Sequence, residues 1–213
     1  MNPFNLPSQS IVYVMDAYCG WCWGFSKQLQ AFEAANRHRI AFTAISGGLF
    51  VGDHAQPISN YPHIPEANKR ITSLTGAVFG EEYDTLLNDG SMILNSLDAG
   101  IASAVLRDHA PDKAIHWAHE LQHAFYIRGL SLSDHTTITD IATAGGLDKN
   151  AVLLDLKNGS GQKQALADFA MSRALGVSSF PTLLFVDGDK VHQLPATGST
   201  LQTLNNKLDN LLA

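Results

Sequence analysis

The sequence is poor in cysteine: its 213 residues include only two, Cys19 and Cys22. A secreted scaffold held by disulfides needs several bridges spread along the chain, and a four-thiolate zinc site needs four sulfurs. The count therefore excludes both kinds of protein. Any chemistry of sulfur in this chain belongs to one closely spaced pair.

Basic residues are also scarce, with 14 Lys and Arg against 20 Asp and Glu, which gives a formal net charge of −6. A protein that binds nucleic acid neutralises phosphates with clustered Lys and Arg. The densest cluster here is Arg37 and Arg39 around His38, a group typical of a solvated helix end. The sequence therefore predicts no nucleic-acid partner.

Long apolar runs are missing as well. Residues 1–10, MNPFNLPSQS, have neither the positive charge nor the apolar stretch of a secretory signal. The apolar run at residues 11–15 is far too short to cross a bilayer. We therefore expect a cytoplasmic protein without a membrane partner, whose thiols lie in a reducing compartment.

The composition is that of a globular protein, with 45% apolar and 16% charged residues and no fixed-period repeat. The length indicates one domain, or one domain with a large insertion. Residues 11–15 and 40–45 have the β-branched and aromatic character of strands. Apolar residues recur with helical spacing between them, from residue 25 to about residue 37, so the chain opens with one βαβ unit.

The middle of the chain has a different character. Pro57, Pro62 and Pro65 interrupt it, and a series of helical segments with capping residues follows. These segments cover residues 112–128, 136–144, 148–159 and 160–176. Strand character returns at residues 182–187 and 191–194, joined by a turn at Gly188, and a leucine-striped helix follows to the end of the chain.

This order predicts an α/β fold in which a helical domain interrupts a second domain. The discontinuous domain comprises residues 1–52 and 176–213, and the inserted helical domain comprises residues 53–175. The strand, hairpin and helix at the end of the chain would join the opening βαβ unit in one central sheet.

The two cysteines lie where the first strand gives way to a helix, in the order Cys19-Gly20-Trp21-Cys22. A thiolate at a helix N-terminus is stabilised by the partial positive charge there, which lowers its pKa. The second thiol can close a disulfide with the first, so the pair forms a reversible two-electron couple. Two structural thiols, or half of a metal site, are the alternatives, and the strand-to-helix context favours redox chemistry.

Two motifs resemble those of a known family. YCGWCWG at residues 18–24 and SSFPTLLF at residues 178–185 are similar to the signatures of the DsbA-like branch of the thioredoxin superfamily, in particular of the predicted cytoplasmic protein-disulfide isomerases. That family also has a helical domain inserted into a thioredoxin fold, so the resemblance covers nearly the whole chain. It implies that Cys19 is the nucleophile, Cys22 the resolving thiol and Pro181 a cis-proline facing the disulfide.

The resemblance further implies a thiol:disulfide oxidoreductase or isomerase acting on protein, peptide or small-molecule disulfides. Phe180, before the cis-proline, would lend backbone groups to an extended substrate, and we expect Trp21 to be exposed between the cysteines for the same purpose. No bound cofactor and no metal are implied. Glutathione or the thioredoxin system would recycle the pair, and no oligomeric state is predicted.

One position departs from the family pattern. Thioredoxin-like proteins often place a buried carboxylate six residues before the first cysteine, where it helps the resolving thiol lose its proton, and here that position is Tyr13. Asp16 lies three residues further along and faces differently by strand alternation, so it does not obviously replace that carboxylate. Gly20-Trp21 is neither the Pro-His of strong oxidants nor the Gly-Pro of thioredoxin.

A second motif competes with the cysteine pair. His119-Glu120-Leu121-Gln122-His123 matches HExxH, the helical signature of zinc hydrolases. No glutamate follows Glu120, and nothing selects another third ligand. We therefore expect His116, His119, Glu120 and His123 to form a solvated helix face, with Trp117 and Leu121 on the opposite face.

Two further alternatives remain. Kappa-class glutathione transferases and chromene-carboxylate isomerases share the inserted architecture and use glutathione, but they carry a single serine or cysteine where this chain has a complete pair. A binding module without catalysis would have thiols that do not cycle with glutathione or thioredoxin reductase.

Overall fold

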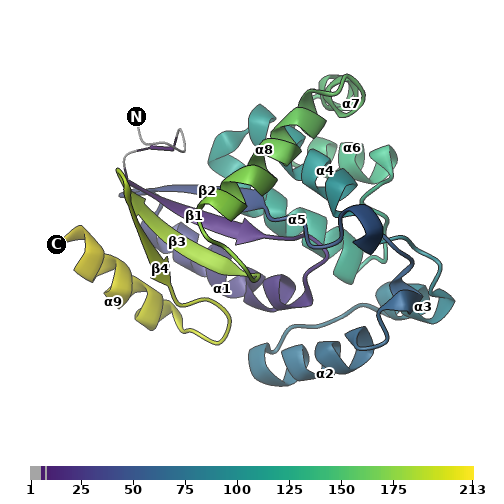
Figure 1. Ribbon diagram of the computed structural model, residues 1–213, viewed down its shortest axis with the longest axis horizontal. Helices are drawn as coiled ribbons and strands as arrows, with labels where there is room; N and C mark the ends of the chain where they lie inside the picture. Colours follow the sequence, from purple (N-terminus) through teal and green to yellow (C-terminus); the bar gives the residue numbers. More distant parts are fainter. Residues whose placement is uncertain (1–5, 8) are drawn as a thin grey trace.

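The computed structural model describes residues 6–7 and 9–213, and a four-stranded sheet in the order β2-β1-β3-β4 lies at its centre (Figure 1). The strands are β1 (Gln9–Met15), β2 (Ala41–Ser46), β3 (Thr182–Asp187) and β4 (Lys190–Leu194). β1 runs parallel to β2 and antiparallel to β3, and β3 pairs antiparallel with β4. The four predicted strands and the closing hairpin are therefore confirmed.

Residues 1–5 and 8 lie outside the described residues, and so does most of the segment for which no secretory signal is predicted. In the part of the chain that the structure describes, no helix has both the length and the apolar character required to cross a membrane.

Strand alternation in β1 divides its side chains between two covered faces. Ile11, Tyr13 and Met15 pack with α1 (Gly20–Asn36) and α9 (Leu201–Leu212), whereas Val12 and Val14 lie on the face covered by the end of α8 (Ser160–Ala174). Figure 1 shows α8 crossing one face of the sheet while α1 lies behind the other. Because β1 is central and covered on both sides, all its residues after Gln9 are buried.

The predicted helical insertion is also confirmed, since every element between β2 and β3 is helical. The elements are η1 (Gly52–His54), η2 (Ile58–Asn60), α2 (Ile64–Thr75), α3 (Glu81–Asp89), α4 (Ser96–His109), η3 (Pro111–Lys113), α5 (Ala114–Tyr126), α6 (His135–Ala144), α7 (Lys149–Lys157) and α8. Pro65 does not interrupt the chain as expected, because it lies in the first turn of α2, where the missing N–H is tolerated. We propose residues 53–175 as the extent of the inserted domain.

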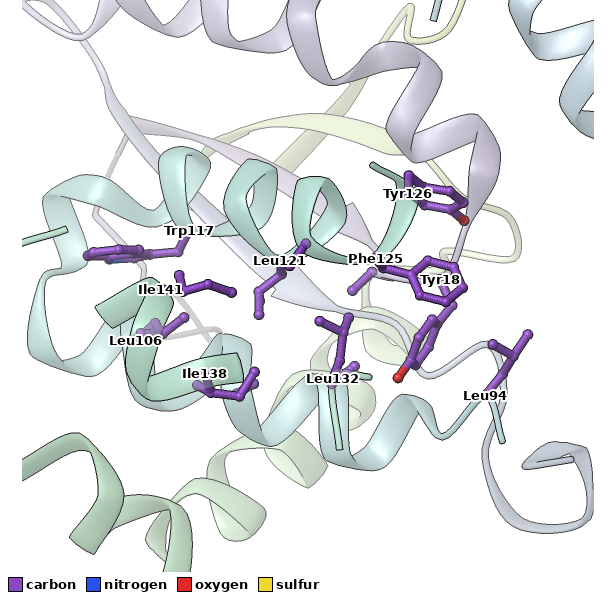
Figure 2. Packing of buried hydrophobic residues seen from close by; sticks show 14 of the residues in the cluster. Tyr18, Leu94, Leu106, Trp117, Leu121, Phe125, Tyr126, Leu132, Ile138 and Ile141 are labelled. Carbon is purple, nitrogen blue, oxygen red and sulfur yellow. The ribbon is translucent and has the colours of Figure 1, made fainter. Parts of the chain in front are cut away.

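The core of the insertion reaches the residues that precede the cysteine pair. Its apolar cluster contains Trp117, Leu121 and Phe125 of α5 together with Tyr18, which stands next to Cys19 (Figure 2). The ring of Tyr18 meets that of Phe125 edge to face, with centroids 4.8 Å apart. The neighbouring turn of α5 packs under the sheet through Ala114, Ile115 and Ala118. Helix α5 therefore contributes residues both to the core of the insertion and to the core beneath the sheet, and it connects the two.

Candidate active site

Cys19 lies at the N-terminus of α1, directly beyond the carboxyl end of β1. It is the residue before the first turn, and its carbonyl accepts the backbone N–H groups of Cys22 (2.9 Å) and Trp23 (3.1 Å). Both sulfurs are free thiols, and the exposed fraction is 6% for Cys19 and 0% for Cys22. The more accessible of the two cysteines is therefore the one placed at the N-terminal end of the helix.

The second motif meets the first in space. The peptide bond between Phe180 and Pro181 is cis, which confirms the predicted cis-proline. The thiol of Cys19 donates a hydrogen bond to the carbonyl oxygen of Phe180 at 3.5 Å, across 161 positions of sequence. The structure therefore brings Cys19, Cys22 and the backbone before Pro181 together at one end of the sheet.

A glycine makes room for the aromatic ring of Phe180. The N–H of Gly47 donates to the carbonyl of Met15 at 2.7 Å, which holds the start of the loop after β2 against β1. A Cβ atom on Gly47 would lie 2.0 Å from the ring of Phe180. Only glycine fits beside that ring, and Gly47 therefore helps to set the position of Phe180.

Cys22 is enclosed by protein. Burial raises the pKa of the Cys22 thiol well above its ordinary value, and the neighbouring Cys19 raises it further. The backbone of Asp16 and the hydroxyl of Tyr13 hydrogen-bond to the thiol and oppose that rise in pKa. Tyr13 also donates from its hydroxyl to the carbonyl oxygen of Cys22 at 3.4 Å. Cys22 is therefore a thiol at neutral pH, in contact with few polar groups.

Asp16 is buried beside the site, but its carboxylate is engaged elsewhere. Its oxygens accept the backbone N–H groups of Tyr18 at 3.0 Å and Leu49 at 2.8 Å. Burial raises the pKa of Asp16, and the hydrogen bond from Leu49 is the largest of the effects that oppose it. The side chain thus ties the loop after β2 to the turn before Cys19.

Trp21 is half-buried, so the expectation that it is exposed is wrong. The guanidinium of Arg70 on α2 lies 5.9 Å from the centroid of its ring, and its carbonyl accepts a hydrogen bond from Thr197. With Cys19 and His63 it lines a cavity of about 140 Å³ between α1 and the inserted helices. Trp21 therefore forms part of a wall beside Cys19.

Helix α2 packs closely against the first turns of α1, a contact that the sequence did not predict. Cβ atoms added to Gly20 and Gly24 would each lie 2.8 Å from the side chain of Ile71 on α2. Two glycines four positions apart on one helix mark a face where another chain segment approaches closely. That spacing is the signal in the sequence that could have revealed the contact.

The HExxH residues are only partly exposed, and the expectation of a solvated face is wrong for His119. His119 is half-buried against α1, where its Nδ1 lies 2.8 Å from the hydroxyl of Ser26 and its ring stacks on Trp23 at 5.6 Å. Burial lowers the pKa of His119. This part of the face packs because α1 lies against it through Trp23 and Ser26. Among the described residues, no group of three His, Cys, Asp or Glu side chains is arranged to hold a metal ion.

Comparisons with known proteins agree with this geometry. The profile of a protein family described as a DSBA-like thioredoxin domain matches residues 10–208. Comparison with curated protein sequences gives no match.

Two solved proteins have the same fold over almost their full lengths. A candidate protein disulfide isomerase of Nitrosomonas europaea is 19% identical with a TM-score of 0.83, and the alignment covers 97% of this chain and 98% of that one. The cytosolic disulfide reductase DsbM of Pseudomonas aeruginosa is 24% identical with a TM-score of 0.82, over 96% of this chain and 100% of that one. A second structure of DsbM, with GSH, has a TM-score of 0.79 at the same identity and the same coverage.

Proposed function

Since the chain belongs to the family of DsbA-like thioredoxin domains, we propose that it is a thiol:disulfide oxidoreductase or isomerase that works through Cys19 and Cys22. One observation carries the proposal: the Cys19 thiol lies at a helix N-terminus and within 3.5 Å of the backbone carbonyl of Phe180. A sulfur at that point has a peptide backbone beside it that can pair with a substrate chain.

The reaction proceeds by two exchanges. The Cys19 thiolate attacks one sulfur of a substrate disulfide, and the other substrate sulfur leaves with the electron pair as a thiolate. Cys22, as a thiolate, then attacks the Cys19 sulfur, so that the Cys19–Cys22 bond forms and the second substrate thiolate leaves. The same steps in reverse oxidise a dithiol. Phe180 and Pro181 position the substrate chain, and Trp21 contacts it from the other side of Cys19.

We further propose that glutathione or the thioredoxin system recycles the pair in the cytoplasm, with no prosthetic group. The GSH-bound structure of DsbM and the cytosolic assignment of that protein support this, as does the cavity beside Cys19. The substrates are disulfide-containing proteins or peptides, and the small disulfide of glutathione is a second substrate class.

Two single substitutions test the function. In an insulin-reduction assay, Cys19→Ser should lower activity to the level of the uncatalysed exchange, because the attacking thiolate is gone. Cys22→Ser should accumulate a mixed disulfide on Cys19, detected by mass spectrometry, because the resolving thiol is absent. Ser26→Ala, which changes a buried hydroxyl further along the same helix, serves as the control. Full activity of Cys19→Ser would refute the proposal.

The same variants separate the glutathione-transferase alternative, which the GSH-bound relative brings into consideration. A transferase needs one thiol or hydroxyl to activate glutathione and does not need a resolving partner. Glutathione-dependent turnover that survives in Cys22→Ser would favour a transferase, whereas its loss together with trapped mixed disulfide would favour the oxidoreductase.

A further inference from the structure

The resolving thiol has an unusual buried partner at the position where a carboxylate would be expected. Tyr13 lies in the middle of β1, 1% exposed, and its side chain projects toward the start of α1. Its hydroxyl donates to the carbonyl oxygen of Cys22 at 3.4 Å. The same side chain lowers the pKa of the Cys22 thiol. A phenol can donate one hydrogen bond and also accept, so the same hydroxyl can face Cys22 either as a thiol or as a thiolate.

Tyr13 stays protonated throughout the reaction. Burial raises its pKa well above the ordinary value, and negative charge on Cys22 or Cys19 raises it further. A carboxylate at this position could take the proton from Cys22, whereas a phenol with a raised pKa cannot. What it can do is donate its own proton into a hydrogen bond with sulfur, and bonds to a charged acceptor are about twice as strong as neutral ones.

A second buried polar side chain stands behind Tyr13. Gln122, on α5, is 1% exposed, and its presence lowers the pKa of the Tyr13 hydroxyl. Neither of its amide atoms reaches hydrogen-bonding geometry with any residue that the structure describes. A buried amide without a partner is unfavourable in an apolar core, where leucine would fill the same space. Its unpartnered amide and its effect on the pKa of Tyr13 together point to a role at the Tyr13 hydroxyl.

We infer that Tyr13 is the hydrogen-bond donor that stabilises the Cys22 thiolate when the mixed disulfide is resolved, and that Gln122 is a positioning residue that orients the phenol. This inference rests on the proposed function. As the Cys22 sulfur attacks Cys19 and the substrate thiolate departs with the electron pair, the proton of Cys22 passes to that thiolate or to solvent, and the Tyr13 hydroxyl turns its proton toward sulfur.

The other groups around Cys22 do not perform this task. The Asp16 carboxylate accepts from the backbone of Tyr18 and Leu49. Cys19 is bonded to the substrate at that moment and carries no charge. Tyr126, on α5, is fully buried. Its burial is the main cause that raises its pKa, and Tyr83 adds to the rise, so Tyr126 is a neutral phenol as well. Among the described side chains that act on the pKa of the Cys22 thiol, Cys19 raises it and Tyr13 lowers it.

The test uses 5,5′-dithiobis(2-nitrobenzoic acid), a disulfide whose two halves are released one after the other. Attack by Cys19 releases the first thionitrobenzoate, and attack by Cys22 on the mixed disulfide releases the second. In Tyr13→Phe we expect the pH profile of the second release to move up by about one unit, so that this step slows about tenfold at pH 7. The rate of the first release should stay within about twofold, which makes it the internal control.

Gln122→Leu should move the second profile in the same direction by a smaller amount, and it carries the test if Tyr13→Phe does not fold. The matched control is Gln28→Leu on α1, which also removes a buried amide nitrogen without a partner and should leave the profile unchanged. Unshifted profiles in both test variants, with both releases intact, would overturn the inference while leaving the proposed function in place. Absence of the second release from the wild-type protein would instead refute the function, and the inference with it.

Discussion

Asp16 is a carboxyl group buried at the edge of the site. Its two oxygens accept backbone N–H groups on either side, from Tyr18 and Leu49, and join the turn before Cys19 to the loop after β2. Burial nevertheless raises its pKa above the ordinary 3.8, and burial raises the pKa of Asp168 in the same way. The folded state therefore binds protons at these two carboxyls more tightly than the unfolded chain does.

A raised carboxyl pKa in the folded state sets the sign of the pH dependence. At a pH between the ordinary pKa and the raised one, the folded protein binds more protons at these carboxyls than the unfolded chain does. The stabilising contribution of each carboxyl to the free energy of unfolding therefore falls as pH rises. Asp16→Asn replaces one oxygen that accepts a buried N–H with an amide NH₂, which cannot accept. We expect the variant to lose about 1–3 kcal/mol in the free energy of unfolding at pH 4. This difference from the wild type should shrink toward pH 7.

Urea denaturation of wild type and variant from pH 4 to pH 7 measures the difference. Asp112→Asn, at an exposed carboxyl, is the control and should give a difference that does not change with pH. A cost of Asp16→Asn that grows as pH rises would mean that the fold favours the ionised carboxylate.

At the scale of single residues, the sequence predicted those parts of the site that depend on local order along the chain. Cys19 and Cys22 stand at a strand-to-helix junction, and the motif around Pro181 resembled that of a family with a cis bond there. The errors concern burial, because the exposure of Trp21 and His119 is decided by helices distant in sequence. Arg70 on α2 covers Trp21, and Trp23 with Ser26 on α1 covers His119.

At the scale of elements, α2 packs closely against α1 because Gly24 of α1 has no side chain at the contact. A Cβ atom on Gly24 would lie 2.8 Å from Cγ2 of Ile71 and 3.1 Å from Oγ1 of Thr75. Ile71 is branched at Cβ and 1% exposed, so it has no room to turn away. Gly24→Ala should therefore push α2 away from α1, and we expect a loss of about 1–3 kcal/mol in the free energy of unfolding.

The sign of that effect should reverse when Ile71 is shortened. In an Ile71→Ala background the obstructing methyl group is gone, and alanine is favoured over glycine in a helix by about 1 kcal/mol. Gly24→Ala should then stabilise the protein. Chemical denaturation of the four proteins in this cycle measures the coupling. Equal effects of Gly24→Ala in the two backgrounds would show that the two helices are not held by this contact.

The sequence predicted helices and strands where both a periodic spacing of apolar residues and capping residues were present. It did not predict them where one of these two signals was missing. The strands and the segment capped by Asp148 follow their patterns, and Asp148 accepts the N–H of Asn150 as a cap should. Helix α3 has only two buried residues, which is too few to show a period. Helix α4 is buried through small residues such as Ala99, Gly100 and Ser103, so its polarity does not alternate between faces.

At the scale of the whole molecule, the insertion and the thioredoxin-like part share a helix. The outer face of α5 lies in the core of the insertion through Leu121, and the inner face packs under the sheet through Ala118 in the cluster that contains Cys22. A buried ion pair adds a second link, since Arg107 of α4 bonds the carboxylate of Asp168 on α8 at 2.7 Å and the carbonyl of Ala44 on β2 at 2.6 Å. The composition and length could not foretell that the two parts are joined in this way.

This sharing predicts that the whole molecule unfolds in one transition. Leu121→Ala, at a fully buried position of the insertion, should cost about 2–5 kcal/mol through loss of contacts and the cavity left behind. Because α5 is common to both cores, the same denaturant shift should appear in far-ultraviolet circular dichroism, which reports mainly the inserted helices, and in alkylation of Cys22, which reports opening of the thioredoxin-like part. Alkylation of Cys22 that keeps the wild-type midpoint while the helical signal is lost earlier would mean that the insertion unfolds alone, and that α5 does not transmit stability between the two parts.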